Sequence, residues 1–259
     1  RGLGDVYKRQ KNICTNMEFP EAILFDLDGV LLDTEPLLAN AWSETAKEYN
    51  HYLSNDKLLE LKGRRRIDCA KKVLKWIKIE SPIEELLITQ KLKVDKVLTK
   101  AKPFKGAIEL IKFCINTNLP IALVTSSSSE SFKIKSSVNP WLNLFKTKVL
   151  GDDKFISNGK PSPDPYLRAL KILDVDPRKS WVIEDSYAGS ISGLKAECNL
   201  MFFSKDIEIL NKLINEFNQE KIQKINELSE IIYYLKLYNC LLYTSDAADE
   251  GLGVDLGGR

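Results

Sequence analysis

The sequence is poor in residues that bind soft metals or form disulfide frameworks. Its five cysteines lie far apart, none of them in a CxxC pair, and His51 is the only histidine. This spacing argues against a zinc site and against a disulfide-stapled domain. We therefore expect a protein of the reducing cytoplasm.

Long apolar runs and an excess of one charge are also missing. The most apolar stretch, Ile231 to Tyr243, is interrupted by Lys236 and Asn239 and is too short to cross a bilayer. A formal charge of +2 is too even to suggest a nucleic-acid or membrane-surface partner. We expect neither partner, and a monomer or weak dimer whose specificity comes from a local site.

The two ends of the chain differ in composition from its middle. Residues 5–10 and 240–245 have the sequences that a transposon end used in sequencing libraries encodes in its two orientations. We therefore predict that 1–16 is an adapter-derived or non-native leader and that 237–259 is an adapter-derived tail. Different codons at these positions in the source DNA would contradict this interpretation.

The middle of the chain alternates between short apolar runs and helical patterns. The runs are typical of strands buried on both faces of a parallel sheet. Helical periodicity separates them, as at 106–117 and 164–173, and a further helix, a weak strand and a closing helix are expected after Phe203. The pattern predicts an α/β fold with a doubly wound, Rossmann-like parallel sheet. The four clearest expected strands are Ala22 to Phe25, Ile121 to Val124, Lys148 to Leu150 and Trp181 to Ile183.

One segment interrupts this alternation, because it has helical spacing and no convincing strand. It runs from Thr34 to about Lys102. We interpret 36–102 as an inserted helical cap, and 17–35 together with 103–236 as the α/β core.

Polar residues follow the expected strands directly. Carboxyl ends of parallel strands form the ligand crevice of open sheets, so these residues should converge. Four clustered carboxylates would repel one another without a cation, and oxygen ligands of this kind favour Mg²⁺. A hydroxyl and an ammonium are natural partners of phosphoryl oxygens. The residues concerned are Asp26, Asp28, Thr125, Lys160, Glu184 and Asp185.

Four segments in this order resemble the motifs of the haloacid dehalogenase superfamily. They are Asp26-Leu-Asp-Gly-Val30, Val124-Thr-Ser126, Gly159-Lys-Pro-Ser-Pro-Asp164 and Ile183-Glu-Asp-Ser-Tyr-Ala-Gly189. A cap inserted just after the first motif is similar to the β-phosphoglucomutase-like and phosphoglycolate-phosphatase-like branch. The resemblance extends from Glu21 to about Ile232.

The resemblance implies a role for each motif residue. Asp26 would attack phosphorus and form an aspartyl-phosphate, while Asp28 would serve as acid and then as base. Asp26, the Asp28 carbonyl and Asp185 would bind Mg²⁺, and Glu184 would fix a metal-bound water. Thr125 and Lys160 would complete the catalytic group. Substrate contacts are expected from Gly29, Thr34, Arg66 and Ser126, with Thr34 near the hinge and Arg66 in a Leu61-Lys-Gly segment that resembles a phosphate-gripping cap segment.

Three functions agree with these residues to different degrees. The favoured one is a Mg²⁺-dependent phosphatase acting on a small phosphorylated metabolite, such as a sugar phosphate or a phosphoglycolate-like compound. A β-phosphoglucomutase-like sugar phosphomutase is the alternative, disfavoured because Leu38 stands where mutase caps carry a histidine. A non-catalytic binding protein of the same fold is the second alternative, disfavoured because no acidic residue is missing.

Overall fold

The computed structural model describes residues 17–78 and 81–249, with side chains as far as Tyr238. Its centre is a six-stranded sheet in the order β5-β4-β1-β6-β7-β8, in which every neighbouring pair is parallel. The strands are β1 (Ala22–Phe25), β4 (Ile121–Val124), β5 (Thr147–Val149), β6 (Ser180–Glu184), β7 (Asn199–Phe202) and β8 (Ile222–Lys224).

The expected strands are present, with β5 shifted by one residue and β6 one residue longer at each end, and β7 is a strand of the sheet that the sequence did not predict. Its four residues contain a short apolar run, whose length does not distinguish a strand from the end of a helix. The predicted α/β fold with a parallel sheet is confirmed.

Helices cover both faces of this sheet. In β1, Ile23 and Phe25 pack into one apolar cluster with α6 and α11, whereas Leu24 packs into another with α8 and α9. Alternate residues of a strand point to opposite faces, so a strand that is buried on both sides must be apolar throughout. The core helices are α6 (Ala107–Asn116), α7 (Ser129–Val138), α8 (Asp164–Leu173), α9 (Tyr187–Lys195), α10 (Ile207–Glu216) and α11 (Leu228–Asp249), with short 3₁₀ turns at η1 (Pro140–Leu144), η2 (Pro177–Lys179) and η3 (Gln219–Lys221).

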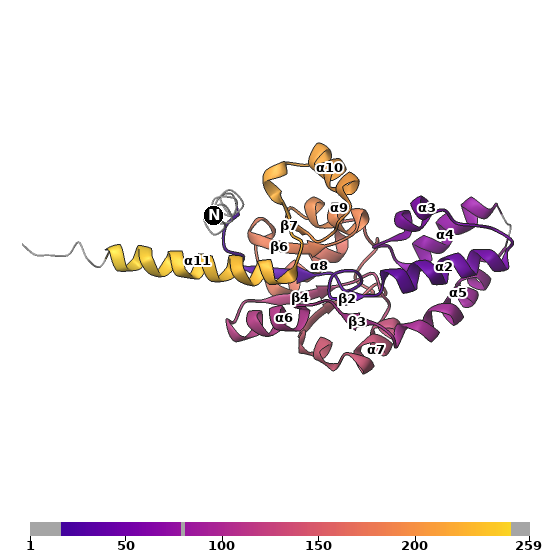
Figure 1. Cartoon of the computed structure of the whole chain (residues 1–259), viewed down its shortest axis with the longest axis horizontal. Helices are drawn as coiled ribbons and strands as arrows, with labels where there is room; N and C mark the ends of the chain where they lie inside the picture. The colour runs from indigo at the N-terminus through magenta and orange to yellow at the C-terminus, as the bar shows by residue number, and fades with distance from the viewer. Residues whose placement is uncertain (1–16, 79–80, 250–259) are drawn as a thin grey trace, which may run out of the picture.

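The cap helices gather at one end of the molecule (Figure 1). They share an apolar cluster of their own, in which Trp42 packs with Val73 and Leu86. The chain leaves the core through β2 (Leu32–Asp33) and returns through β3 (Lys102–Pro103), and these two strands pair antiparallel. This pairing ties the two connections together and supports our proposed cap boundaries. The cap helices are α2 (Glu35–Glu48), α3 (Asn55–Leu61), α4 (Arg66–Ile77) and α5 (Ile83–Leu98).

The last helix projects from the core at the end opposite the cap (Figure 1). Tyr238 near its middle lies against Phe19 and Trp181, with ring centroids 6.2 and 6.5 Å apart. Helix α11 therefore packs against the core as far as Tyr238, two residues beyond residue 236, where the sequence predicted the α/β core to end. The predicted leader, 1–16, and residues 250–259 of the predicted tail lie outside the described residues.

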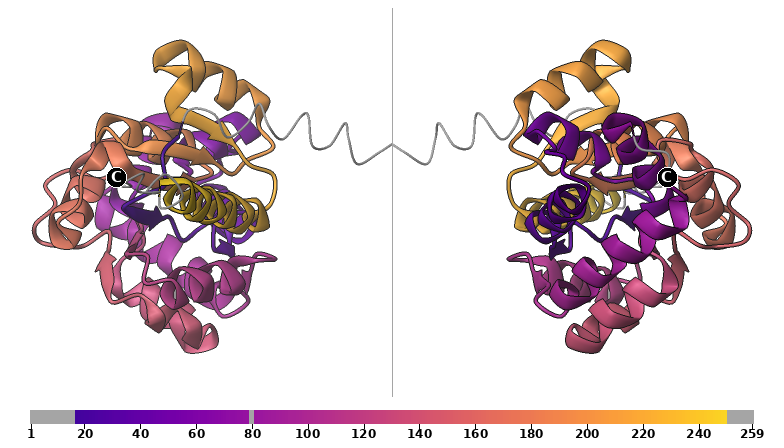
Figure 2. Two further views of the ribbon diagram at one scale, coloured as in Figure 1. Left: turned by 90° about the vertical axis from the view of Figure 1, so that its left-hand side faces the viewer. Right: turned by 90° about the vertical axis from the view of Figure 1, so that its right-hand side faces the viewer.

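The view along the long axis shows α10, in orange, and α7, in pink, at opposite edges of the core (Figure 2). This agrees with the strand order, in which β7 and β8 lie on one side of β1 and β4 and β5 on the other. The carboxyl ends of β1, β4 and β6 are therefore adjacent. Within the described residues, no helix is long and apolar enough to cross a membrane.

Candidate active site

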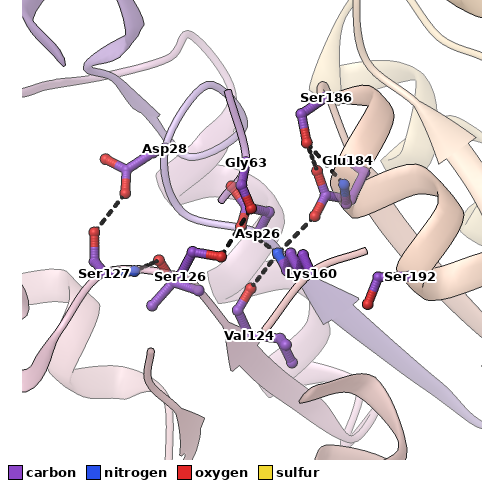
Figure 3. A network of polar contacts seen from close by, with 12 residues as sticks. Asp26, Asp28, Gly63, Val124, Ser126, Ser127, Lys160, Glu184, Ser186 and Ser192 are labelled. Carbon is purple, nitrogen blue, oxygen red and sulfur yellow. Dashed lines mark hydrogen bonds and ion pairs between the residues drawn. The ribbon is translucent and has the colours of Figure 1, made fainter. Parts of the chain in front are cut away.

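A buried lysine joins the ends of the three central strands. Lys160 lies beyond β5, is 1% exposed, and donates to Asp26 Oδ1 at 2.6 Å, to Glu184 Oε1 at 2.6 Å and to the Val124 carbonyl at 2.9 Å (Figure 3). Burial alone would lower the pKa of Lys160, but the two carboxylates outweigh burial and raise that pKa above its ordinary value. The ammonium is therefore a fixed positive charge between two acidic groups.

Glu184 is completely buried, and both oxygens of its carboxylate accept hydrogen bonds. Its Oε1 also accepts from the Tyr166 hydroxyl at 2.7 Å, and its Oε2 accepts from Ser186 Oγ at 3.1 Å. Gly189 lies directly against this carboxylate, because a Cβ there would stand 1.9 Å from Oε1. Helix α9 can begin beside the carboxylate only because position 189 has no side chain.

Asp26, Glu184 and Asp185 form a compact group of carboxylates. Each offers an oxygen within 4.8 Å of the others, and all three are buried. Burial raises the pKa of Asp26 well above its usual value despite the opposing effect of Lys160, and burial raises the pKa of Asp185 to about 7. Such a group is unfavourable by itself, because charges of one sign repel strongly where water is excluded.

This carboxylate group fits a hard divalent cation. All its donors are oxygens, and the buried Asp185 Oδ1 has no hydrogen-bond partner among the residues that the structure describes. Gly29 has a φ of +91° and approaches Asp185 so closely that a Cβ would stand 1.7 Å from Oδ2. A few carboxylate oxygens, completed by waters and a substrate phosphate oxygen, are the ligands that Mg²⁺ accepts in proteins. A cation here would also lower the pKa of each carboxyl by favouring its charged form.

Asp28 is held apart from this group. Its side chain accepts from Lys135 Nζ at 2.5 and 2.6 Å, from Thr34 Oγ1 at 2.5 Å and from Ser127 Oγ at 2.8 Å. Burial opposes ionisation of this carboxyl, but Lys135 and the two hydroxyls together bring the pKa of Asp28 below its ordinary value. Two acids two residues apart thus have their pKa values shifted in opposite directions. Such divergence is characteristic of carboxylates that perform different tasks.

The cap closes over these acids, and two of its polar contacts with the core lie at the site. Lys62 Nζ lies 2.5 Å from Asp185 Oδ2. Ser126 Oγ donates to the Gly63 carbonyl at 2.8 Å, as Figure 3 shows. Between cap and core lies a cavity of about 270 Å³. It is lined by Asp26, Asp28 and Thr125 from the core and by Arg66 from the cap, and it has room for a small metabolite.

Comparison with known proteins agrees with this arrangement. The sequence profile of the haloacid dehalogenase-like hydrolases matches residues 23–203. The chain belongs to this family. It is 31% identical over 172 residues to the phosphorylated carbohydrates phosphatase of Thermotoga maritima. The matched region covers 65% of this chain and 78% of that protein. It is 30% identical over 183 residues to hexitol phosphatase A of Escherichia coli, covering 70% and 82% respectively.

The fold of this haloacid dehalogenase-like hydrolase is also that of solved structures. One is β-phosphoglucomutase from Clostridium difficile, with a TM-score of 0.70, 21% identity, and 87% of this chain and 100% of that one covered. The resemblance predicted from the sequence is therefore confirmed, as is membership of an enzyme family.

Most of the predicted site residues of this hydrolase lie together at the carboxyl ends of the central strands or around the cavity. Asp26, Asp28, Lys160, Glu184 and Asp185 lie as described above, and the roles assigned to them remain proposals. Three other predicted residues, Thr125, Ser126 and Arg66, line the cavity.

Thr34 and Gly29 lie differently from their prediction as substrate contacts. Thr34 is fully buried behind Asp28 and is not among the cavity-lining residues. Gly29 lines a second cavity, which Asp185 also lines. Thr34 sits where it can orient Asp28, and Gly29 sits where it leaves room for Asp185.

Lys135 is the principal residue that the sequence reasoning missed. It lies on α7 in no recognisable motif, yet it is completely buried and pairs with Asp28 at a sequence distance of 107 residues. One signal was available. Phe132 and Val138 stand three residues before and after Lys135 and so share one helix face with it. A lysine on the core-facing side of a helix requires a buried anion.

Proposed function

We propose that this chain is a Mg²⁺-dependent phosphatase that hydrolyses a small phosphorylated metabolite, a sugar phosphate or a phosphoglycolate-like compound, through an aspartyl-phosphate. One observation carries the proposal. The Asp26 carboxylate lines the cavity between cap and core, while Lys160 fixes its Oδ1 and two further carboxylates stand beside it.

In the first step an Asp26 carboxylate oxygen attacks phosphorus, and the bond from phosphorus to the leaving oxygen breaks. The leaving oxygen takes a proton from the Asp28 carboxyl. The incoming phosphate dianion favours the protonated form of this carboxyl, because it places a like charge nearby. In the second step Asp28 removes a proton from water, the water oxygen attacks phosphorus, and the bond to Asp26 breaks to release phosphate. Dividing the reaction between a nucleophile and one proton carrier gives two easier steps.

Asp26, the Asp28 carbonyl and Asp185 would hold Mg²⁺, with Glu184 fixing a water of its shell. The ion would neutralise the phosphoryl charge that builds up beside these carboxylates. Lys160 keeps the Asp26 side chain in one orientation, and Thr125 presents a hydroxyl to the phosphoryl oxygens. Lys135, Thr34 and Ser127 keep the Asp28 side chain directed away from the carboxylate group.

The relatives support hydrolysis of phosphorylated carbohydrates, since two of them are named for phosphatase activity on such compounds. Leu38 lines the cavity on the cap side and cannot exchange a proton, which further favours hydrolysis over the mutase reaction. Cytoplasmic localisation, a monomeric or weakly dimeric state and the absence of nucleic-acid and membrane partners stay predictions.

A phosphate-release screen tests this function. Phosphorylated metabolites are incubated with the protein with and without Mg²⁺, and conversion of glucose 1-phosphate is followed in parallel. We expect phosphate release from several compounds, only with the metal present. Isomerisation of glucose 1-phosphate without release would support the mutase, and no turnover of any compound would support the non-catalytic alternative.

Arg66 is expected to recognise a second anionic group of the substrate. It is the first residue of α4, lines the cavity, and has no carboxylate partner within the described part of the chain. Arg66→Ala should raise KM by about 10- to 100-fold for bisphosphates or phosphorylated acids, because a charge-assisted hydrogen bond is lost. Steady-state kinetics on singly and doubly anionic substrates measures this. Arg178→Ala, a surface change outside the cavity, is the control, and equal effects on both substrate types would refute the assignment.

A further inference from the structure

The cavity contains one buried polar group that the reaction does not use. Gln90 lies on α5, is 2% exposed and lines the cavity between cap and core. Its Oε1 is buried and has no hydrogen-bond partner in the described part of the chain. A buried amide oxygen without a partner costs free energy in the free protein, so its retention calls for an explanation.

The packing of α5 does not explain why a glutamine stands at position 90. The buried side of this helix carries Leu86, Gln90, Val94 and Leu98, each four residues from the next. Three of these four are aliphatic, and they provide the apolar face that packs against the other cap helices. A leucine at position 90 would continue this face at no desolvation cost. The amide is therefore out of place in a helix face that serves packing alone.

The side chains around Gln90 indicate which kind of ligand group would hydrogen-bond its amide oxygen. Most of the cavity lining from α2 and α5 is apolar and includes Leu38, Trp42, Val94 and Leu98; besides Gln90, Glu35 at the start of α2 is the polar residue these two helices contribute. A carboxylate or ammonium in contact with these four side chains would lose its hydration, which costs a neutral group far less. A hydroxyl is neutral, and it both donates and accepts, so it satisfies the amide whichever way the side chain is turned.

We propose that Gln90 is a specificity-determining residue that hydrogen-bonds a free hydroxyl on the organic part of the substrate. This inference rests on the phosphatase function proposed above and deepens it. The phosphate lies at Asp26, the carbon chain extends toward the apolar wall, and Gln90 selects phosphomonoesters of polyols and sugars over deoxygenated analogues of the same length.

Three matched substrate pairs test this selection. They are glycerol 3-phosphate with n-propyl phosphate, ribose 5-phosphate with 2-deoxyribose 5-phosphate, and glucose 6-phosphate with 2-deoxyglucose 6-phosphate. In at least one pair the wild type is expected to prefer the hydroxylated member in kcat/KM. Gln90→Leu should reduce that preference by about 10- to 100-fold, because the lost partner is a buried hydrogen bond. Hydrolysis of p-nitrophenyl phosphate, which has no aliphatic hydroxyl, should stay within about twofold.

A matched control and a second readout separate recognition from structure. Leu86→Met changes the same buried face one turn away, at a residue that does not line the cavity, and should leave the preference unchanged. Gln90→Leu should also raise Tm in the absence of substrate, since the orphan oxygen is removed. Equal loss on both members of every pair, absence of any preference in the wild type, or a lowered Tm would overturn the proposal. Failure of the wild type to hydrolyse p-nitrophenyl phosphate with Mg²⁺ would overturn the phosphatase function itself, and this inference with it.

Discussion

Asp26→Asn is expected to lower the phosphatase kcat by on the order of 10⁴- to 10⁶-fold, the range seen when a covalent nucleophile is removed. An amide oxygen is a poor nucleophile toward phosphorus, and the neighbouring Asp28 cannot take its place, because Lys135 holds its carboxylate. Turnover of p-nitrophenyl phosphate with Mg²⁺ measures the effect. Trapping of beryllofluoride, a phosphoryl mimic, should be lost in parallel.

The fold should tolerate this change. Asn keeps an acceptor for Lys160, and Lys160 retains its contact with Glu184. The raised pKa of Asp26 means that its charged form is less favourable in the folded protein than in the unfolded chain. At neutral pH without metal, loss of that charge should leave Tm unchanged or raise it. Asp174→Asn, an exposed position at the end of α8, controls for the substitution, and full metal-dependent activity of Asp26→Asn would refute the nucleophile assignment.

Lys135→Met is expected to reduce kcat by about 10²- to 10⁴-fold on alkyl phosphates, the usual contribution of a positioned acid or base. Lys135 is the one ammonium that contacts both oxygens of Asp28 within the described residues. Without it Asp28 loses its fixed orientation and its counter-charge. The loss should be smaller for p-nitrophenyl phosphate, whose leaving group needs no proton, and this dependence on the leaving group is the measurement.

Two further variants test whether Lys135 works through Asp28. Lys133→Met, at an exposed position of the same helix, should be without effect. Adding Lys135→Met to Asp28→Asn should cost little more activity than Asp28→Asn alone, since residues that act as a unit are not additive. The double variant should also melt above Lys135→Met, because it leaves no unpaired carboxylate. Independent, additive losses would argue that Lys135 acts elsewhere.

The fold was largely predictable because its signals are local. Fully apolar runs such as Ala22 to Phe25 require burial on both faces of a sheet, and helical spacing between them requires crossovers. The site motifs were predictable for the same reason, since Asp26, Thr125 and Glu184 each end a strand or directly follow one. The paired strands β2 and β3 escaped prediction because each is two residues long, and β7 because only three of its four residues are apolar and no polar site residue follows it.

The sequence by itself determined the strand-end acids, their order along the chain and the place of the cap insertion, since each follows from residue type and spacing. Only the tertiary structure decided which lysine serves which acid. Lys160 pairs with Asp26 and Lys135 with Asp28, across 134 and 107 residues, in a chain that holds 38 basic residues. The same holds for Gln90, an ordinary glutamine in the sequence. Pairing in a buried site depends on which side chains the packing of α7 and of the cap brings within hydrogen-bond distance, and no local pattern encodes that distance.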